Sequence, residues 1–177
     1  MTVPSYRSQK VLLIGMMGCG KTTVGTALSA RIGWPYLDND VMLERTTGQT
    51  AADIVVTDGE DALRVAESRV LTFMLGMPTH IVGGVAGGVV LDDGDRSRLA
   101  ASDAHVVWLR ASPKVLARRV GSGAGRPKLG SDPEAALRKL AAERNPYYEQ
   151  VADQVIDVDA LAVGVIAKLV LEELEIP

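Results

Sequence analysis

A glycine-rich octapeptide near the N-terminus constrains this chain more than any other feature. Residues 15–22 read GMMGCGKT and match the pattern G-x-x-x-x-G-K-[ST]; an apolar run at 11–14 precedes them and a helix-like segment at 22–32 follows. In this context glycines let the backbone curl so that successive amide groups point at phosphate oxygens, and the helix adds the positive end of its dipole. The octapeptide therefore predicts a phosphate-binding loop in an α/β fold.

Individual side chains of this loop have expected roles. Lys21 is expected to meet the β- and γ-phosphates of ATP, and the Thr22 hydroxyl is expected to bind Mg²⁺. A glycine-rich turn without a ligand would need neither the lysine nor the threonine. Cys19 is expected to be a small side chain that fits among the amides, with a thiol that can serve as a chemical probe. The candidate nucleotide contacts in the loop are Gly18, Cys19, Gly20, Lys21, Thr22 and Thr23.

Composition and charge argue against several classes of protein. The 177 residues are 47% hydrophobic and 23% charged, which is too apolar for disorder and sufficient for one domain, over 1–177, with its own core. A net charge of −3 provides no basic field for nucleic acid. The apolar run at 11–17 is far shorter than the roughly 20 residues of a membrane span. With a single cysteine and no apolar leader in residues 1–9, the chain is expected to be cytoplasmic.

Apolar runs alternate with helix-like segments along the chain. This alternation is typical of strand, helix, strand units whose parallel sheet is covered on both faces, so the expected fold class is α/β. The expected strands are 11–14, 36–37, 81–82, 106–109 and 155–158, and the expected helices are 22–32, 59–75, 133–149 and 159–174. Helix caps are expected at Asp58, at Asp132 and at Asp157 or Asp159, because a short carboxylate can accept the free amide hydrogens of a helix start.

One segment, 121–131, reads GSGAGRPKLGS and is rich in glycine and charge without periodicity. It can be a plain surface connection or a mobile loop that covers a substrate. An arginine and a lysine among several glycines, in a chain that binds nucleotide, favour the covering loop.

Two sequence signals of other phosphate-loop proteins are missing. The chain has no N-K-x-D element of the kind GTPases use to read the base, and the expected third strand, HIVGGVAGG, ends in glycines rather than in the acidic residue of large ATPases. The nearest carboxylates are Asp38 and Asp40 in YLDND, at the end of the second expected strand, where parallel strands meet the ligand crevice. One of these carboxylates can bind Mg²⁺ while the other binds an acceptor hydroxyl, or both can cap the following helix.

Several motifs occur in an order and spacing that resemble the shikimate kinase family. They are GMMGCGKTT, LDND, ERTTGQTAADIVVTDGE, LRVAE, AGG, VVWL, GRPKL and AAERNPYYEQVAD, and they extend over about residues 11–153. The resemblance implies a three-layer P-loop fold of the nucleoside-monophosphate-kinase type, with five parallel strands in the order 2-3-1-4-5, a substrate-binding region at about 39–76 and a lid at about 120–131. It implies a kinase that uses ATP and Mg²⁺ to convert shikimate to shikimate 3-phosphate in aromatic amino acid biosynthesis. We also expect a monomer.

The resemblance implies roles for single residues as well. Asp38 would help hold Mg²⁺, and Asp40 would hold and orient the acceptor hydroxyl. Arg64 and Arg144 would grip the carboxylate of the substrate, since a planar guanidinium matches that group better than lysine does. The remaining implied contacts are Gly87 and Gly88 at the substrate ring, Arg126 in the lid over ATP, and Arg119 near the phosphates. The candidate catalytic residues are Lys21, Asp40 and Arg126.

Four positions depart from the family pattern. Ala86 stands at the first position of a G-G-G run, Leu63 replaces a phenylalanine, Lys128 adds a charge to the lid, and VDALAVG has no arginine to place against the adenine. These departures leave two alternatives open. One is a kinase for another small polyol acid or cyclitol, and the other is a non-catalytic relative that binds nucleotide.

Overall fold

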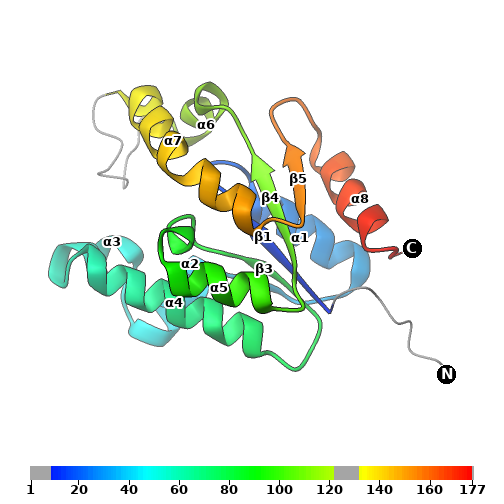
Figure 1. Ribbon diagram of the computed structural model, residues 1–177, viewed down its shortest axis with the longest axis horizontal. Helices are drawn as coiled ribbons and strands as arrows, with labels where there is room; N and C mark the ends of the chain where they lie inside the picture. Colours follow the sequence, from blue (N-terminus) through cyan, green and yellow to red (C-terminus); the bar gives the residue numbers. More distant parts are fainter. Residues whose placement is uncertain (1–8, 122–131, 177) are drawn as a thin grey trace.

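The structure is a computed structural model that describes residues 9–121 and 132–176. Its centre is a sheet of five parallel strands in the order β2-β3-β1-β4-β5, flanked by helices (Figure 1). The strands are β1 Lys10–Ile14, β2 Tyr36–Asp38, β3 Ile81–Gly84, β4 His105–Arg110 and β5 Gln154–Asp157. The expected α/β class and the strand order implied by the resemblance are therefore confirmed.

Strand β1 lies in the middle of the sheet and leads directly into the phosphate loop. All five of its residues are buried, as expected for a strand covered on both faces. It pairs in parallel with β3, where Leu13 lies opposite Gly84, and with β4, where Ile14 lies opposite Trp108. The carboxyl ends of β1 and β3 thus meet at the edge of the sheet where open α/β proteins bind their ligands.

The helices pack in groups around this sheet. Helix α1 lies beside α8, α6 lies beside α7, and α2, α3 and α5 all contact α4 (Figure 1). The bounds are α1 Lys21–Ile32, α2 Asn39–Thr47, α3 Ala51–Thr57, α4 Glu60–Gly76, α5 Asp93–Ala101, α6 Pro113–Val120, α7 Pro133–Val151 and α8 Val163–Glu173, with a 3-10 turn η1 at Val89–Leu91. Because three helices support α4, that helix can present side chains to the ligand edge in a defined position.

The four predicted helices correspond to α1, α4, α7 and α8. Helix α2 was expected only under the alternative in which Asp38 and Asp40 cap the following helix, and α3, α5 and α6 were not predicted. The missed helices have seven to nine residues, too few for an apolar stripe to recur over several turns. All four short helices carry start signals that can be read in the sequence, since Asp38 caps α2 and Asp92 caps α5. Thr50 and Asp53 form a capping box at the start of α3, and Ser112 followed by Pro113 opens α6.

One of the expected helix caps is confirmed, and the others are wrong. Asp132 accepts a hydrogen bond from the Ala135 amide at the start of α7. Asp58 instead closes α3, and the N-cap of α4 is a glycine. At the C-terminal end, α8 starts after Ala162 without a side-chain cap.

The two candidate caps for α8 have other partners. Asp157 ends β5 and forms an ion pair with Arg110 of the neighbouring strand. Asp159 accepts a hydrogen bond from the Ser112 amide. The pairing of β4 with β5 brings both partners close, so tertiary contacts override the local capping preference.

The expected lid lies largely outside the residues that the structure describes. Arg126 and Lys128 both fall in 122–131, which is outside the described ranges. Within residues 9–121 and 132–176, no helix has the length and apolar character needed to cross a membrane.

Candidate functional site

A cleft of about 750 Å³ lies at the carboxyl ends of β1, β2 and β3. The phosphate loop forms one wall, and residues of α4, α7 and the β3–η1 connection form the other. Every predicted site residue in the described part of the chain lines this cleft. Those residues are Gly18, Cys19, Gly20, Lys21, Thr22, Thr23, Asp38, Asp40, Arg64, Gly87, Gly88, Arg119 and Arg144.

The phosphate loop depends on glycines at its bends. Gly15, Gly18 and Gly20 have φ values of 136°, 81° and 104°, in the region that side-chain-bearing residues rarely adopt. A Cβ at Gly15 would lie 2.7 Å from the Leu109 carbonyl oxygen. The loop then enters α1, whose first residue is Lys21, so its free amides lie at the helix N-terminus.

The Lys21 amine is directed back into this loop. Its Nζ donates to the carbonyl oxygens of Gly15 at 2.8 Å and Met16 at 3.3 Å. Cys19 is 2% exposed, with its Sγ 3.9 Å from the same amine. The structure therefore supports the interpretation of Cys19 as a small, enclosed side chain, and the expectation of an accessible thiol probe is wrong.

The Asp38 carboxylate connects the phosphate loop to β2. Its Oδ2 accepts hydrogen bonds from the Thr22 and Tyr36 hydroxyls, each at 2.9 Å. Its Oδ1 accepts the Asp40 amide at 3.0 Å and so caps α2. Burial, reinforced by the negative charge of Asp38, raises the pKa of Tyr36, so this phenol stays protonated and donates. Asp38 thus both caps the helix and contacts the proposed metal-binding threonine.

The oxygens at this point fit a magnesium ion. Mg²⁺ prefers hard oxygen ligands and is usually held by one or two protein groups together with phosphates and water. Thr22 and Asp38 supply two such groups beside the phosphate loop. Among the described residues there is no cluster of three or more His, Cys, Asp or Glu side chains that could hold a metal ion.

On the other side of the cleft, Arg64 forms an ion pair with Glu67 one turn along α4. Glu67 is 7% exposed. Burial raises the pKa of Glu67, and the positive charge of Arg64 opposes that shift. Gly88 provides the space for the guanidinium, since a Cβ there would lie 1.8 Å from Arg64 Nη1.

Arg144 reaches the cleft from α7 and is 4% exposed. Its Nη1 donates to the Gly87 carbonyl oxygen at 3.2 Å, and the Tyr148 hydroxyl donates to the same oxygen at 2.6 Å. Arg144 Nε is buried and has no hydrogen-bond partner among the described residues. A buried guanidinium with an unused donor is costly unless an anion completes it, so this wall is suited to a carboxylate.

Three residues of the site were missed by sequence reasoning, although each has a positional signal. Glu67 follows Arg64 by three residues and Tyr148 follows Arg144 by four, spacings that place side chains on one helix face. Tyr36 precedes Asp38 by two residues, which places both on one face of β2.

The departures from the family pattern lie in the walls of the cleft. Leu63 and Ala86 are both buried there, so this part of the cleft is bounded by aliphatic groups. At the nucleotide end, Leu161 and Val163 line the cleft. Arg119 donates to the Cys19 and Val158 carbonyl oxygens at 3.4 and 2.9 Å, which ties the phosphate loop to the end of β5.

Comparisons with known proteins agree with this geometry. The family model for shikimate kinase matches residues 17–175. The chain is 38% identical over 163 residues to the shikimate kinase of Thermobifida fusca, covering 92% of this chain and 93% of that protein. It is 36% identical over 168 residues to the shikimate kinase of Symbiobacterium thermophilum, covering 93% and 95%. Among solved structures, the shikimate kinase from Acinetobacter baumannii in complex with shikimate has a TM-score of 0.87 and 32% identity, covering 93% of this chain and 91% of that one.

Proposed function

This chain belongs to the shikimate kinase family, and on that premise we propose that it transfers the terminal phosphoryl group of ATP to the 3-hydroxyl of shikimate. It is a small-molecule kinase that uses ATP as the phosphate donor. The observation that carries the assignment of the acceptor is the buried Arg144, whose Nε has no hydrogen-bond partner among the described residues and whose side chain lines the cleft together with Arg64. A ring acid such as shikimate brings the carboxylate that this pair requires.

The ATP phosphates bind on the amides of the phosphate loop. There they replace the Gly15 and Met16 carbonyl oxygens as partners of Lys21, whose amine points into the loop. Thr22 and Asp38 hold Mg²⁺, which neutralises negative charge on the phosphates when it is bound. Arg119, from α6, and Arg126, in the proposed lid at 120–131, add positive charge near the phosphates.

The acceptor binds between α4 and α7. Arg64 and Arg144 hold its carboxylate, the backbone at Gly87 and Gly88 faces its ring, and Asp40 orients its hydroxyl. The hydroxyl oxygen forms a bond to the γ-phosphorus as the bond to the β-phosphate oxygen breaks and its electrons leave with ADP. Asp40 takes the hydroxyl proton. Positioning and charge neutralisation supply most of the rate acceleration, because the transition state of phosphoryl transfer is loose.

Residues 1–177 form one kinase domain whose substrate-binding region is at about 39–76, and the protein acts as a cytoplasmic monomer without nucleic-acid or membrane partners. The net charge of −3 supports the absence of a nucleic-acid partner, since it provides no general attraction for phosphate backbones.

A second candidate is a kinase for another polyol acid or a cyclitol. It is motivated by Leu63 and Ala86, which give the acceptor side aliphatic walls. Polar interactions favour shikimate, because a neutral ring would bring no anion to the buried Arg144, and an uncompensated buried charged group costs about 2 to 5 kcal/mol. Aliphatic substitutions in a pocket usually change binding by about 1 to 3 kcal/mol.

A coupled assay of ADP release with shikimate and a panel of neutral cyclitols tests the acceptor. We expect shikimate to give the highest kcat/KM, and Asp40→Asn to lower kcat chiefly. A neutral cyclitol with a higher kcat/KM than shikimate would remove the acceptor assignment and leave the kinase assignment intact.

A further inference from the structure

Tyr36 lies outside the group of predicted site residues, yet its hydroxyl contacts the Asp38 carboxylate directly. We propose that Tyr36 is a positioning residue of the magnesium site, which holds the Asp38 carboxylate turned toward Thr22. This inference rests on the proposed function, since it concerns the same nucleotide and metal.

The fold builds a slot for the Tyr36 ring from two glycines on different elements. A Cβ at Gly25 of α1 would lie 2.2 Å from Tyr36 Cε2, and a Cβ at Gly84 of β3 would lie 2.3 Å from the Tyr36 hydroxyl oxygen. Neither glycine has a positive φ, so the close approach of the ring is the reason that a side chain is excluded at each position. The parallel pairing of β2 with β3 places Asp38 opposite Gly84, and the hydroxyl is thereby directed at the carboxylate.

The acceptor capacity of Asp38 is nearly filled. An ionised carboxylate offers about four lone-pair positions. The Thr22 and Tyr36 hydroxyls occupy Oδ2, each at 2.9 Å, and the Asp40 amide occupies one position on Oδ1 at 3.0 Å. The carboxylate cannot rotate without breaking at least two of these bonds.

This arrangement sets the direction of the Thr22 hydroxyl. The Thr22 hydroxyl donates its proton to the Asp38 carboxylate, so the lone pairs of the hydroxyl oxygen point away from that carboxylate and remain available to a cation. Asp38 keeps about one lone-pair position on Oδ1 for the metal or for a water bound to the metal. Without the Tyr36 hydroxyl, Oδ2 would have a single donor, and the carboxylate would lose the contact that fixes its plane.

The expected effect is on magnesium rather than on nucleotide binding. Removing a hydrogen-bond partner that orients a metal-binding side chain typically lowers metal affinity by about 10- to 100-fold. Asp38 is only half-buried, so water can replace part of the lost bond and we expect an effect near the lower end, about tenfold. Affinity for ADP without metal should not change, because Tyr36 is not among the residues that line the cleft.

The test compares wild type with Tyr36→Phe, which keeps the ring that fills the slot. Calorimetry gives the Kd of ADP in EDTA and in excess Mg²⁺, and the ratio of the two reports how strongly the metal and the nucleotide are coupled. The binding of Mg²⁺ to free ADP is common to both proteins and cancels when their ratios are compared. We expect the ratio to fall about tenfold in Tyr36→Phe.

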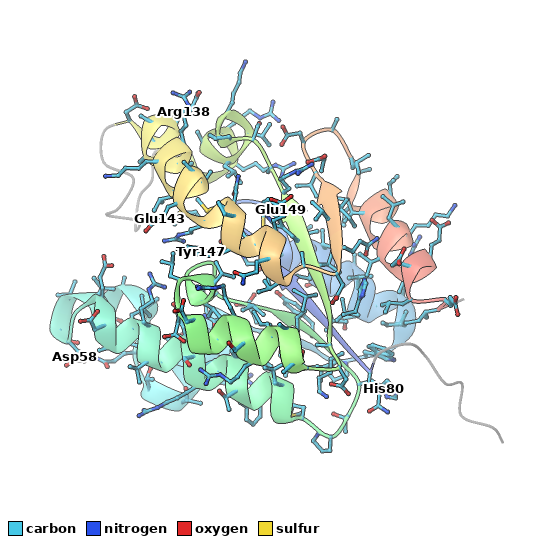
Figure 2. The ribbon with its side chains drawn as sticks, in the orientation of Figure 1. Asp58, His80, Arg138, Glu143, Tyr147 and Glu149 are labelled. Atoms are coloured by element: carbon cyan, nitrogen blue, oxygen red, sulfur yellow. The ribbon has the colours of Figure 1, made fainter. Side chains whose placement is uncertain are left out.

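Tyr147→Phe is the matched control. Tyr147 lies on α7 beside α5 (Figure 2), where the Arg96 guanidinium stacks 4.2 Å from the centre of its ring. The Tyr147→Phe variant loses a hydroxyl that does not contact Asp38, so its ratio of ADP Kd values should equal that of wild type. Circular dichroism of each variant checks that the fold is retained.

A second comparison separates action through Asp38 from a general structural effect. In an Asp38→Asn background, adding Tyr36→Phe should cause no further loss of coupling, because the partner that Tyr36 positions is already impaired. An equal loss in both backgrounds would overturn the inference, as would a Tyr36→Phe ratio within twofold of wild type. A wild-type protein without any coupling of Mg²⁺ to ADP would overturn the proposed function, and this inference with it.

Discussion

The substitution Gly88→Ala should damage acceptor binding without affecting ATP. Gly88 has φ −94° and ψ −10°, a negative-φ conformation that is allowed for residues with a Cβ, so the added methyl group acts mainly through its contacts. The added Cβ would instead lie 1.8 Å from Arg64 Nη1 and 2.4 Å from its Cζ. Arg64 must therefore leave its position, and both its ion pair with Glu67 and its proposed contact with the substrate carboxylate are lost.

The size of the effect follows from the contact that is lost. A hydrogen bond to a charged group contributes about 1.5 to 3 kcal/mol, which corresponds to a loss of roughly 10- to 150-fold in kcat/KM for shikimate. The free energy of unfolding should fall by only about 1 to 2 kcal/mol, because the Arg64 side chain is 26% exposed and is displaced rather than removed.

Steady-state kinetics at varied shikimate and fixed saturating ATP, and the reverse, measure the two KM values, and urea unfolding measures stability. Gly76→Ala, at the end of the same helix as Arg64, is the control, because a Cβ at Gly76 has no heavy atom within 4 Å. If Gly88→Ala kept the KM for shikimate within twofold of wild type, the position assigned to Arg64 in the acceptor site would be wrong.

Three further predictions concern single charged groups. Lys21→Ala should abolish turnover and leave urea unfolding nearly unchanged, since the amine bonds only to atoms of its own loop in the described structure; a wild-type kcat would contradict the assignment of the phosphate loop. Arg144→Ala should raise the KM for shikimate strongly and that for ATP little, whereas Arg138→Ala, an exposed arginine of α7 (Figure 2), should change neither. Folding raises the pKa of Glu67 above its usual value of 4.5, so the folded protein holds this proton more tightly than the unfolded chain does. The resulting stabilisation is greatest below pH 4.5 and is lost as pH rises through the pKa of Glu67 in the folded protein. Wild type should therefore lose stability relative to Glu67→Gln as pH rises above 4.5, and a constant difference would show that Glu67 does not titrate in this way.

Much of the nucleotide side could be predicted from the sequence because its parts are contiguous. The loop at 15–22 specifies its own backbone path through its glycines, and Lys21 and Thr22 follow directly within it. Asp38 and Asp40 were found by their place at a strand end, and the structure puts both in the cleft. The order of the strands came from the resemblance to a known family, since the alternation of elements alone is compatible with several orders.

The acceptor side depended on contacts between segments that are far apart in the chain. Arg144 and Tyr148 of α7 both donate to the carbonyl oxygen of Gly87, which lies 57 and 61 residues away in the chain. No local sequence pattern predicts that these two side chains share a hydrogen-bond partner. Arg64 read alone is an ordinary helix-surface arginine; its ion pair with Glu67 and the space left by Gly88 give it a defined direction.

The same competition between local and distant partners explains the failed caps. Asp157 has the short carboxylate that favours a helix start, yet it binds Arg110 because β4 and β5 pair side by side. Tyr36 likewise reads as an apolar strand residue until Gly25 and Gly84 are seen to close around its ring and direct its hydroxyl at Asp38. The sequence by itself determined the path of the phosphate loop, since its glycines and amides are consecutive in the chain. The tertiary structure decided which side chains surround the acceptor, because their hydrogen bonds exist only once the packed elements bring distant residues within reach.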